Sequence, residues 1–308
     1  MKKYRDLAGD AGSEVARQLL DQTARLQARM ATVRHKVAIL SGKGGVGKSA
    51  LTSNLAAALA GEGARVGVLD ADLNGPSLAK MLGVRGAALR MGPAGVEPPE
   101  GPLGIKVLSM DLLLPRDGTP VRWDAPTERE SYVWRGTVEA AALREFLSDT
   151  AWGALDFLLL DLPPGTDRVS TLASLLPEVG AAVVVTIPTE VSHLTVKRSI
   201  SMAKELWGGS ALGLVENMAA YVCARCGEEG PLFRGPDSAA MARELGVAFL
   251  GRVPFEPRLA EAADRGVPYV MGEPETPAAA ALRAVTAALR ALVERRAARP
   301  AAGGSVVG

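Results

Sequence analysis

The sequence has almost no net charge, no long apolar run and only two cysteines. Its 35 Lys and Arg residues nearly cancel its 34 Asp and Glu residues, so no overall field favours nucleic acid or a membrane surface. The N-terminus lacks the apolar segment of a signal peptide, and no run of about eighteen apolar residues occurs that could cross a membrane. These absences predict a cytoplasmic protein that binds neither nucleic acid nor membranes.

The two cysteines, Cys223 and Cys226, form the motif C-x-x-C-G. A reducing compartment disfavours a structural disulfide, so the pair indicates a metal or redox role. Zn²⁺ and a [4Fe–4S] cluster both bind thiolates but need more than two, and the chain has no further cysteine. A twofold-symmetric dimer would supply four sulfurs from two chains. The alternatives are a surface loop without a metal and a disulfide that forms only on air oxidation.

A glycine-rich segment between a predicted strand and a predicted helix is typical of a nucleotide phosphate site. The apolar run 37–40 precedes it and the Ala- and Leu-rich stretch 51–59 follows it. Glycines allow successive backbone N–H groups to face phosphate oxygens, and the start of the helix adds its positive dipole end. In this pattern Lys48 contacts the β- and γ-phosphates and the hydroxyl of Ser49 binds Mg²⁺. The predicted ATP-binding residues of this phosphate loop are Gly42, Lys43, Gly44, Gly45, Val46, Gly47, Lys48, Ser49 and Ala50.

Two aspartates follow the apolar run 65–69. Carboxylates at the end of a strand in a parallel sheet project toward the crevice where phosphates bind. Either Asp70 or Asp72 alone would be an ordinary solvated acid, but the Gly-Pro turn directly beyond them favours a functional pair. We expect Asp72 to orient the water that attacks the γ-phosphate.

A third aspartate, Asp161, closes the apolar run 157–160. An aspartate at the end of a buried strand is the Walker B arrangement, which holds Mg²⁺. We therefore predict that Asp161 and Ser49 share the Mg²⁺ ion. The Pro-Pro-Gly sequence at 163–165 predicts a stiff turn that senses the γ-phosphate.

Apolar runs alternate with helical patterns along most of the chain, as in an α/β protein with a doubly wound, mostly parallel sheet. The Gly- and Pro-rich segment Gly83–Gly104 interrupts the alternation and predicts a loop or a hairpin. The apolar stripe of the last helix lacks Phe and Trp, which favours core packing over a membrane anchor. The expected strands are 65–69, 105–110, 157–160, 181–187, 212–215 and 248–250, and the later helices lie near 137–147, 191–206, 238–245 and 277–295.

Three parts are predicted along the chain. Residues 1–33 form an N-terminal extension with an amphipathic helix from about Gly12 to Val33, packed on its own domain or on a partner subunit. Residues 34–298 form the ATPase domain with the C-x-x-C loop. Residues 299–308 have too little apolar content to fold and are expected to be disordered.

The second lysine of the phosphate loop, Lys43, directly follows its first glycine. This arrangement resembles the deviant Walker A (SIMIBI) loop of the MinD, ParA, nitrogenase iron protein and Mrp group of dimeric P-loop ATPases, in which that lysine crosses the dimer interface. Within this group, the stretch Val215-Glu216-Asn217-Met218, followed by an aromatic residue and C-x-x-C-G, is specific to one family. Over most of residues 33–270 the chain resembles the Mrp/ApbC family of iron–sulfur cluster carrier ATPases.

The resemblance implies a homodimer that binds ATP and Mg²⁺, holds a [4Fe–4S] cluster between its subunits at Cys223 and Cys226, and transfers it to apo-proteins. It implies that Asn217 lies against the adenine. We predict Lys43, Lys48 and Asp72 as the catalytic residues. The chain departs from the family in the turn after Pro-Pro-Gly. The family usually continues with Thr-Gly-Asp, whereas here Asp167-Arg168 follows Thr166, and this difference predicts tuned or weak ATP hydrolysis. The alternatives are a MinD/ParA-like positioning ATPase, or the same ATPase with structural Zn²⁺ at the cysteines.

Overall fold

The computed structural model describes residues 11–114, 131–165, 167–208, 211–223 and 225–298. A mostly parallel sheet in the strand order β10-β8-β7-β1-β6-β2-β5 forms its centre. All pairs along this path are parallel, whereas the short β9 (Glu229–Gly230) pairs antiparallel with the end of β8. The strands are β1 (Val33–Ser41), β2 (Val66–Asp70), β5 (Lys106–Leu108), β6 (Leu155–Asp161), β7 (Ala181–Thr186), β8 (Ala211–Val222) and β10 (Ala248–Phe255).

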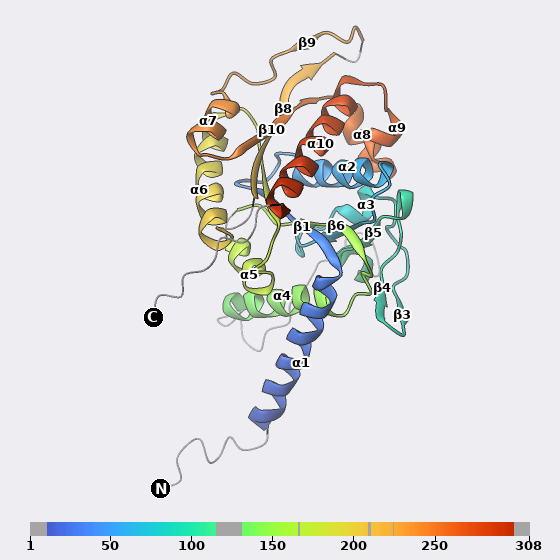
Figure 1. The fold of residues 1–308 in the computed structure, drawn as a ribbon. Coiled ribbons are helices and arrows are strands. Elements are labelled where there is room, and N and C mark those ends of the chain that lie inside the picture. The colour runs from blue at the N-terminus through green and yellow to red at the C-terminus, as the bar shows by residue number, and fades with distance from the viewer. Residues whose placement is uncertain (1–10, 115–130, 166, 209–210, 224, 299–308) are drawn as a thin grey trace.

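Helices cover both faces of the sheet, which confirms the doubly wound α/β architecture (Figure 1). Alternate residues of a strand point to opposite faces, so Val37 and Ile39 of β1 join one buried cluster and Ala38 and Leu40 the other. The first face is covered by α2 (Lys48–Gly61), α3 (Leu78–Met81), α8 (Arg258–Arg265), α9 (Tyr269–Gly272) and α10 (Pro277–Ala297), and the second by α4 (Ser131–Ser148), α5 (Asp167–Leu175), α6 (Glu190–Leu206) and α7 (Ser238–Glu244).

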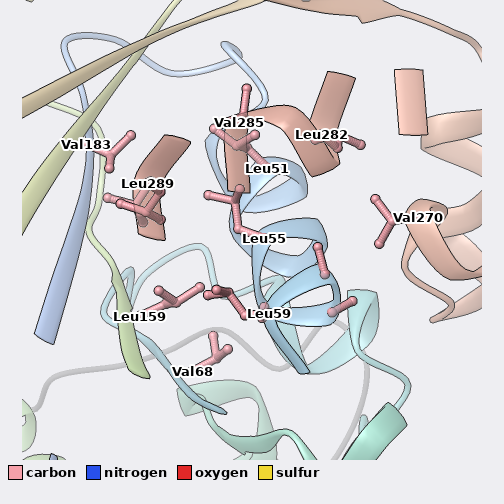
Figure 2. Packing of buried hydrophobic residues seen from close by; sticks show 14 of the residues in the cluster. Leu51, Leu55, Leu59, Val68, Leu159, Val183, Val270, Leu282, Val285 and Leu289 are labelled. Carbon is pink, nitrogen blue, oxygen red and sulfur yellow. The ribbon is translucent and has the colours of Figure 1, made fainter. Parts of the chain in front are cut away.

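The last helix, α10, packs into the core. Figure 2 shows Leu282, Val285 and Leu289 of α10 beside Leu51 and Leu55 of α2. These five side chains are at most 2% exposed, and burial of each contributes about 1.5–3 kcal/mol. The predicted core role of this helix is confirmed. Among the described residues, no helix is both long and apolar enough to span a membrane.

The N-terminal helix, α1 (Ala11–Ala31), extends away from the sheet (Figure 1). Its last turns pack on α4 through the buried side chains of Leu26 and Met30. Farther toward the N-terminus, Leu19 and Leu20 are exposed. Within the described residues α1 therefore contacts its own chain by its C-terminal half.

Several expected boundaries differ from the structure. The helix predicted to reach residue 33 ends at Ala31, because β1 begins at Val33. The strand predicted over 105–110 is limited to 106–108 and is followed by the 3₁₀-helix η3 (Met110–Leu113), which Ser109 caps through its hydroxyl.

Other segments were incompletely predicted. The strand predicted over 212–215 continues to Val222, since β10 and β9 pair with its extension. The hairpin predicted in the Gly- and Pro-rich segment is confirmed by β3 (Arg90–Gly92) and β4 (Gly95–Glu97), and the segment ends in the 3₁₀-helix η2 (Pro102–Gly104), which was not predicted. The predicted disordered tail, 299–308, lies outside the described residues.

Candidate nucleotide site and cysteine hairpin

The phosphate loop connects the end of β1 to the start of α2. Gly45 and Gly47 have φ values of 77° and 78°, in the left-handed region that glycine adopts without strain. Gly42 is needed for another reason, because a Cβ there would lie 2.5 Å from Oγ1 and 2.8 Å from the carbonyl carbon of Thr195. Helix α6, which carries Thr195, therefore packs directly on the loop.

A buried ion pair lies at the start of α2. Lys48 Nζ is 2.8 Å from Asp161 Oδ2, and the two side chains are 7% and 0% exposed. Ser49 Oγ donates to the same carboxylate oxygen at 2.6 Å, and Thr52 Oγ1 donates to Asp161 Oδ1 at 2.8 Å. The structure thus brings together the predicted residues Lys48, Ser49 and Asp161. Thr52 was not predicted, although its position one helical turn after Ser49 could have indicated it.

Asp70 lies beside Asp161, since the two residues pair in register on β2 and β6. It is 1% exposed, and its Oδ2 accepts hydrogen bonds from the N–H groups of Ser77 at 2.8 Å and Leu78 at 3.0 Å. Ser109 Oγ donates to the same oxygen at 3.1 Å. Burial, together with the charge of Asp161, raises the pKa of Asp70 to about 7. Asp70 therefore anchors the loop that follows β2.

Asp72 lies in that loop and is half-buried. Its N–H donates to Asp70 Oδ1 at 3.2 Å, and its own Oδ1 accepts from the N–H of Gly75 at 3.1 Å. Within the described residues, the carboxylate of Asp72 forms no hydrogen bond or ion pair with the phosphate loop. Asn74 Nδ2 donates to Glu139 Oε1 at 3.0 Å, which ties the same loop to α4.

The Pro-Pro-Gly turn lies against the phosphate loop. A Cβ on Gly44 would be 3.9 Å from Cγ of Pro164. Gly165, with φ 94°, donates its N–H to the carbonyl of Ser41 at 3.0 Å. Thr166 lies outside the described residues, so the effect of the Asp167-Arg168 departure stays a prediction.

Lys43, on the lip of the loop, is half-buried. Its ammonium group forms no hydrogen bond or ion pair with any part of the chain that the structure describes. The predicted reach of this lysine into a second subunit is compatible with that geometry and stays a prediction.

Asn217 of β8 contacts the phosphate loop from the other side. It is 9% exposed, and its Nδ2 donates to the carbonyl of Val46 at 2.8 Å. A Cβ on Gly47 would lie 2.3 Å from the same nitrogen and would displace the Asn217 side chain, and the φ of 78° independently favours glycine at this position. The structure places Asn217 against the loop, and its predicted adenine contact stays a prediction.

The two cysteines lie in the turn of a hairpin. Cys223 directly follows β8, whose last residues Tyr221 and Val222 pair with Gly230 and Glu229 of β9. The N–H of Cys223 donates to the carbonyl of Glu228 at 3.0 Å. The sequence predicted a loop after a strand that ends at residue 215, whereas β8 continues to Val222 and leads directly into the turn.

Both thiols are free, with Cys223 half-buried and Cys226 exposed. Hydrogen bonds from the backbone N–H groups of Cys226 and Arg225 lower the pKa of the Cys223 thiol. Among the described residues, no three or more Cys, His, Asp or Glu side chains gather at a metal-binding distance. His193 is hydrogen-bonded to Ser238 at 2.9 Å, away from the hairpin turn. The described part of a single subunit therefore offers a metal two thiolates, those of Cys223 and Cys226.

The sequence matches one family over most of its length. The model of the ParA-type NUBPL iron-transfer P-loop NTPases matches residues 32–290. The chain belongs to this family. It is 46% identical over 254 residues to an iron–sulfur cluster carrier protein of Saccharolobus solfataricus, covering 82% of each chain. The carrier protein of Methanocaldococcus jannaschii is also 46% identical over 254 residues, covering 82% of this chain and 83% of the relative.

Solved structures support the fold of this NUBPL-family chain. A nucleotide-binding protein of Archaeoglobus fulgidus, in complex with ADP, is 34% identical with a TM-score of 0.67 and covers 79% of this chain and 91% of its own. The cell division ATPase MinD of Pyrococcus furiosus is 23% identical with a TM-score of 0.57, covering 84% and 99%. At that identity MinD shows the shared fold alone, which is that of the MinD/ParA-type P-loop NTPases.

Proposed function

We propose that the protein is an ATP-dependent carrier that holds a [4Fe–4S] cluster between two copies of its chain and transfers it to apo-proteins. The observation that carries the proposal is that one strand, β8, joins a P-loop to a hairpin of two free thiols. Asn217 of β8 donates to the phosphate loop, and Cys223 directly follows the last residue of the strand. The names of the relatives agree with a carrier.

ATP is assigned to the phosphate loop at 42–50. Successive N–H groups of this loop and the dipole of α2 bind the phosphates, and Lys48 supplies the buried positive charge. The hydroxyl of Ser49 and the carboxylate of Asp161 are adjacent oxygen donors, the ligands that suit Mg²⁺. When bound, Mg²⁺ neutralises charge on the β- and γ-phosphate oxygens.

Hydrolysis is assigned to Asp72 and Lys43. Asp72 orients a water molecule toward the γ-phosphate, and the products are ADP and inorganic phosphate. Asp70 holds the loop of Asp72 by accepting hydrogen bonds from the N–H groups of residues 72, 77 and 78, and it also accepts one from the hydroxyl of Ser109 after β5. Lys43 has no ion-pair partner in the described part of its own chain and contacts the nucleotide of the second subunit.

The cluster is assigned to Cys223 and Cys226 of both subunits. Each chain supplies two thiolates, and a four-iron cluster takes four. The lowered pKa of Cys223 favours the thiolate form that binds iron. We place the protein in the cytoplasm, where thiols stay reduced.

Transfer to an acceptor tests this function. The protein is reconstituted anaerobically with iron and sulfide, repurified and mixed with the apo form of a four-iron hydratase, whose recovered activity reports transfer. We expect activity with the wild type and none with Cys226→Ser. Arg234→Ser, at an exposed position beyond the same hairpin, is the control and should transfer normally.

Two results would contradict the proposal. A colourless protein that contains Zn²⁺ and transfers no iron would support the structural zinc alternative. A protein that binds neither metal but assembles on DNA or on lipid vesicles with ATP would support a positioning ATPase.

A further inference from the structure

The backbone of β8 is irregular between the phosphate loop and the cysteines. Asn217 pairs with Val253 of β10, but Tyr221, four residues later, pairs with Phe255, only two residues later. β8 therefore bulges over residues 218–220. Met218 opens the bulge with φ 54°, in the left-handed region that residues with a Cβ rarely occupy.

The side chain of Met218 makes contacts that glycine could not make at this strained position. Glycine would adopt the same φ without strain, and glycine fills most of the left-handed positions in the described chain. The Cε of Met218 lies 3.5 Å from the place that a Cβ on Gly47 would occupy. Met218 also packs against the buried cluster that contains Val46 and Leu51. The methionine is therefore a contact between β8 and the phosphate loop.

On its other side the bulge leads directly to the cysteines. Four residues separate Met218 from Cys223, and two of them, Tyr221 and Val222, pair with β9. The N–H of Cys223 continues the same hairpin by donating to the carbonyl of Glu228 at 3.0 Å. The bulge is therefore joined to the hairpin that presents both thiols by a short segment that is paired with β9.

We propose that Met218 couples the phosphate loop to the cysteine hairpin, so that nucleotide binding changes the exposure of Cys223 and Cys226. Met218 is a positioning residue, which acts through Gly47 on one side and through the bulge on the other. The biological role of this coupling rests on the proposed carrier function, but the coupling itself is measurable in protein that carries no cluster.

The coupling follows from how the loop binds phosphate. Phosphate binding adds charged acceptors to the N–H groups of the loop, so it changes the forces on the backbone at Val46 and Gly47. Asn217 is bonded to Val46 and Met218 rests on Gly47, so this change reaches two successive residues of β8. A return of Met218 to the extended region relieves its strain and shifts the hairpin, which gives the bulge two discrete arrangements.

Thiol alkylation tests the coupling. The rate of reaction of the cluster-free protein with iodoacetamide is measured with and without Mg-ADP. In the wild type we expect the nucleotide to change the rate about fivefold, because the rate follows the equilibrium between exposed and protected thiols, and coupling between sites shifts such an equilibrium by about that factor or more. Met218→Gly keeps the left-handed backbone and removes the contact with Gly47, so its rate should not respond to nucleotide.

Two variants control the test. Met218→Leu keeps an apolar side chain of similar volume and should restore the response. Met91→Gly makes the same exchange at an exposed methionine of β3 and should respond as the wild type does. Nucleotide affinity is measured for each protein, since Met218→Gly should still bind Mg-ADP through the loop and Lys48. If Met218→Gly fails to fold, Met218→Ala, which also deletes the contact, should show the same loss.

Three results would overturn the coupling: a wild type whose alkylation ignores nucleotide, a Met218→Gly protein that keeps the wild-type response, and a Met218→Leu protein that loses it. Iron content after reconstitution is measured separately on the same proteins. If the wild type binds no cluster but shows the nucleotide response and its loss in Met218→Gly, the carrier function fails and the coupling stands.

Discussion

At the scale of single residues, the nucleotide site is organised around one buried carboxylate. Asp161 accepts from Lys48 and Ser49 on one oxygen and from Thr52 on the other. The order of loop and acid in the sequence predicted Lys48, Ser49 and Asp161. Thr52 was not predicted, although helix periodicity places it one turn after Ser49. Ser109 could not be predicted, since only the pairing of β5 with β2 brings it to Asp70.

Lys48→Ala should lower the affinity for Mg-ATP by roughly 10- to 100-fold, because a hydrogen bond to a charged group contributes about 1.5–3 kcal/mol. Isothermal titration of the purified variant measures this loss. Lys80→Ala, at an exposed lysine of α3, is the matched control and should bind normally. Unchanged affinity in Lys48→Ala would contradict the assignment of the phosphate site.

Asp72→Asn should bind Mg-ATP as the wild type does and hydrolyse it about 10²- to 10⁴-fold more slowly, the usual contribution of a positioned acid or base. The amide keeps an oxygen for the N–H of Gly75, so the turn of the loop is preserved. Phosphate release under saturating ATP is the measurement, with Asp264→Asn on the exposed face of α8 as control. Wild-type turnover would show that Asp72 only shapes its own loop.

Cys223 should react with iodoacetamide at a lower pH than an ordinary cysteine. The N–H groups that point at its sulfur stabilise the thiolate and lower its pKa, so the thiolate forms, and the rate rises, earlier as the pH increases. The profile is measured in Cys226→Ser, which keeps the backbone N–H of residue 226, and compared with the same protein in denaturant. If the alkylation rate of the folded and of the denatured protein had the same midpoint pH, the turn would not lower the pKa of Cys223.

At the scale of elements, the phosphate loop is held between α6 and β8. Gly42 lies against Thr195 of α6, and Gly47 lies against Asn217 of β8. The sequence predicted the loop and both neighbouring elements but not their contacts with the loop. The length of β8 was also missed, because Glu216, Asn217 and the two alanines at 219 and 220 interrupt the apolar run, and pairing with β10 and β9 holds this part in the sheet.

Gly42→Ala should destabilise the protein by about 1–3 kcal/mol, as expected when a methyl group is forced into a packed contact. The new Cβ would meet both the side chain and the backbone of Thr195, and rotation of the side chain cannot relieve the second contact. Urea unfolding measures the change. Gly44→Ala is the control, since its Cβ would meet only Pro164, at 3.9 Å. Equal stability of the two variants would show that α6 yields to the extra methyl group.

At the scale of the whole molecule, the alternating apolar runs were sufficient to predict the doubly wound sheet. The pattern of burial on both faces of β1, β6 and β7 is visible in the sequence as continuous apolar runs. The small helices α3, α8 and α9 were not predicted, because each is short and all three pack against α2, a contact that the local sequence does not show. Two thiolates per chain remain the strongest reason to expect a dimer.

Iron stoichiometry tests the central claim most directly. After anaerobic reconstitution, iron, sulfide and the native mass of the protein are measured on one sample. The account predicts a dimer with about two irons and two sulfides per chain, the share of one four-iron cluster held by four thiolates. Cys223→Ser and Cys226→Ser should each lose the cluster yet retain ATP hydrolysis, at least in part, because the cysteines lie outside the phosphate site. A monomer that holds a full four-iron cluster, or a cysteine variant with wild-type iron and sulfide, would contradict the bridging cluster.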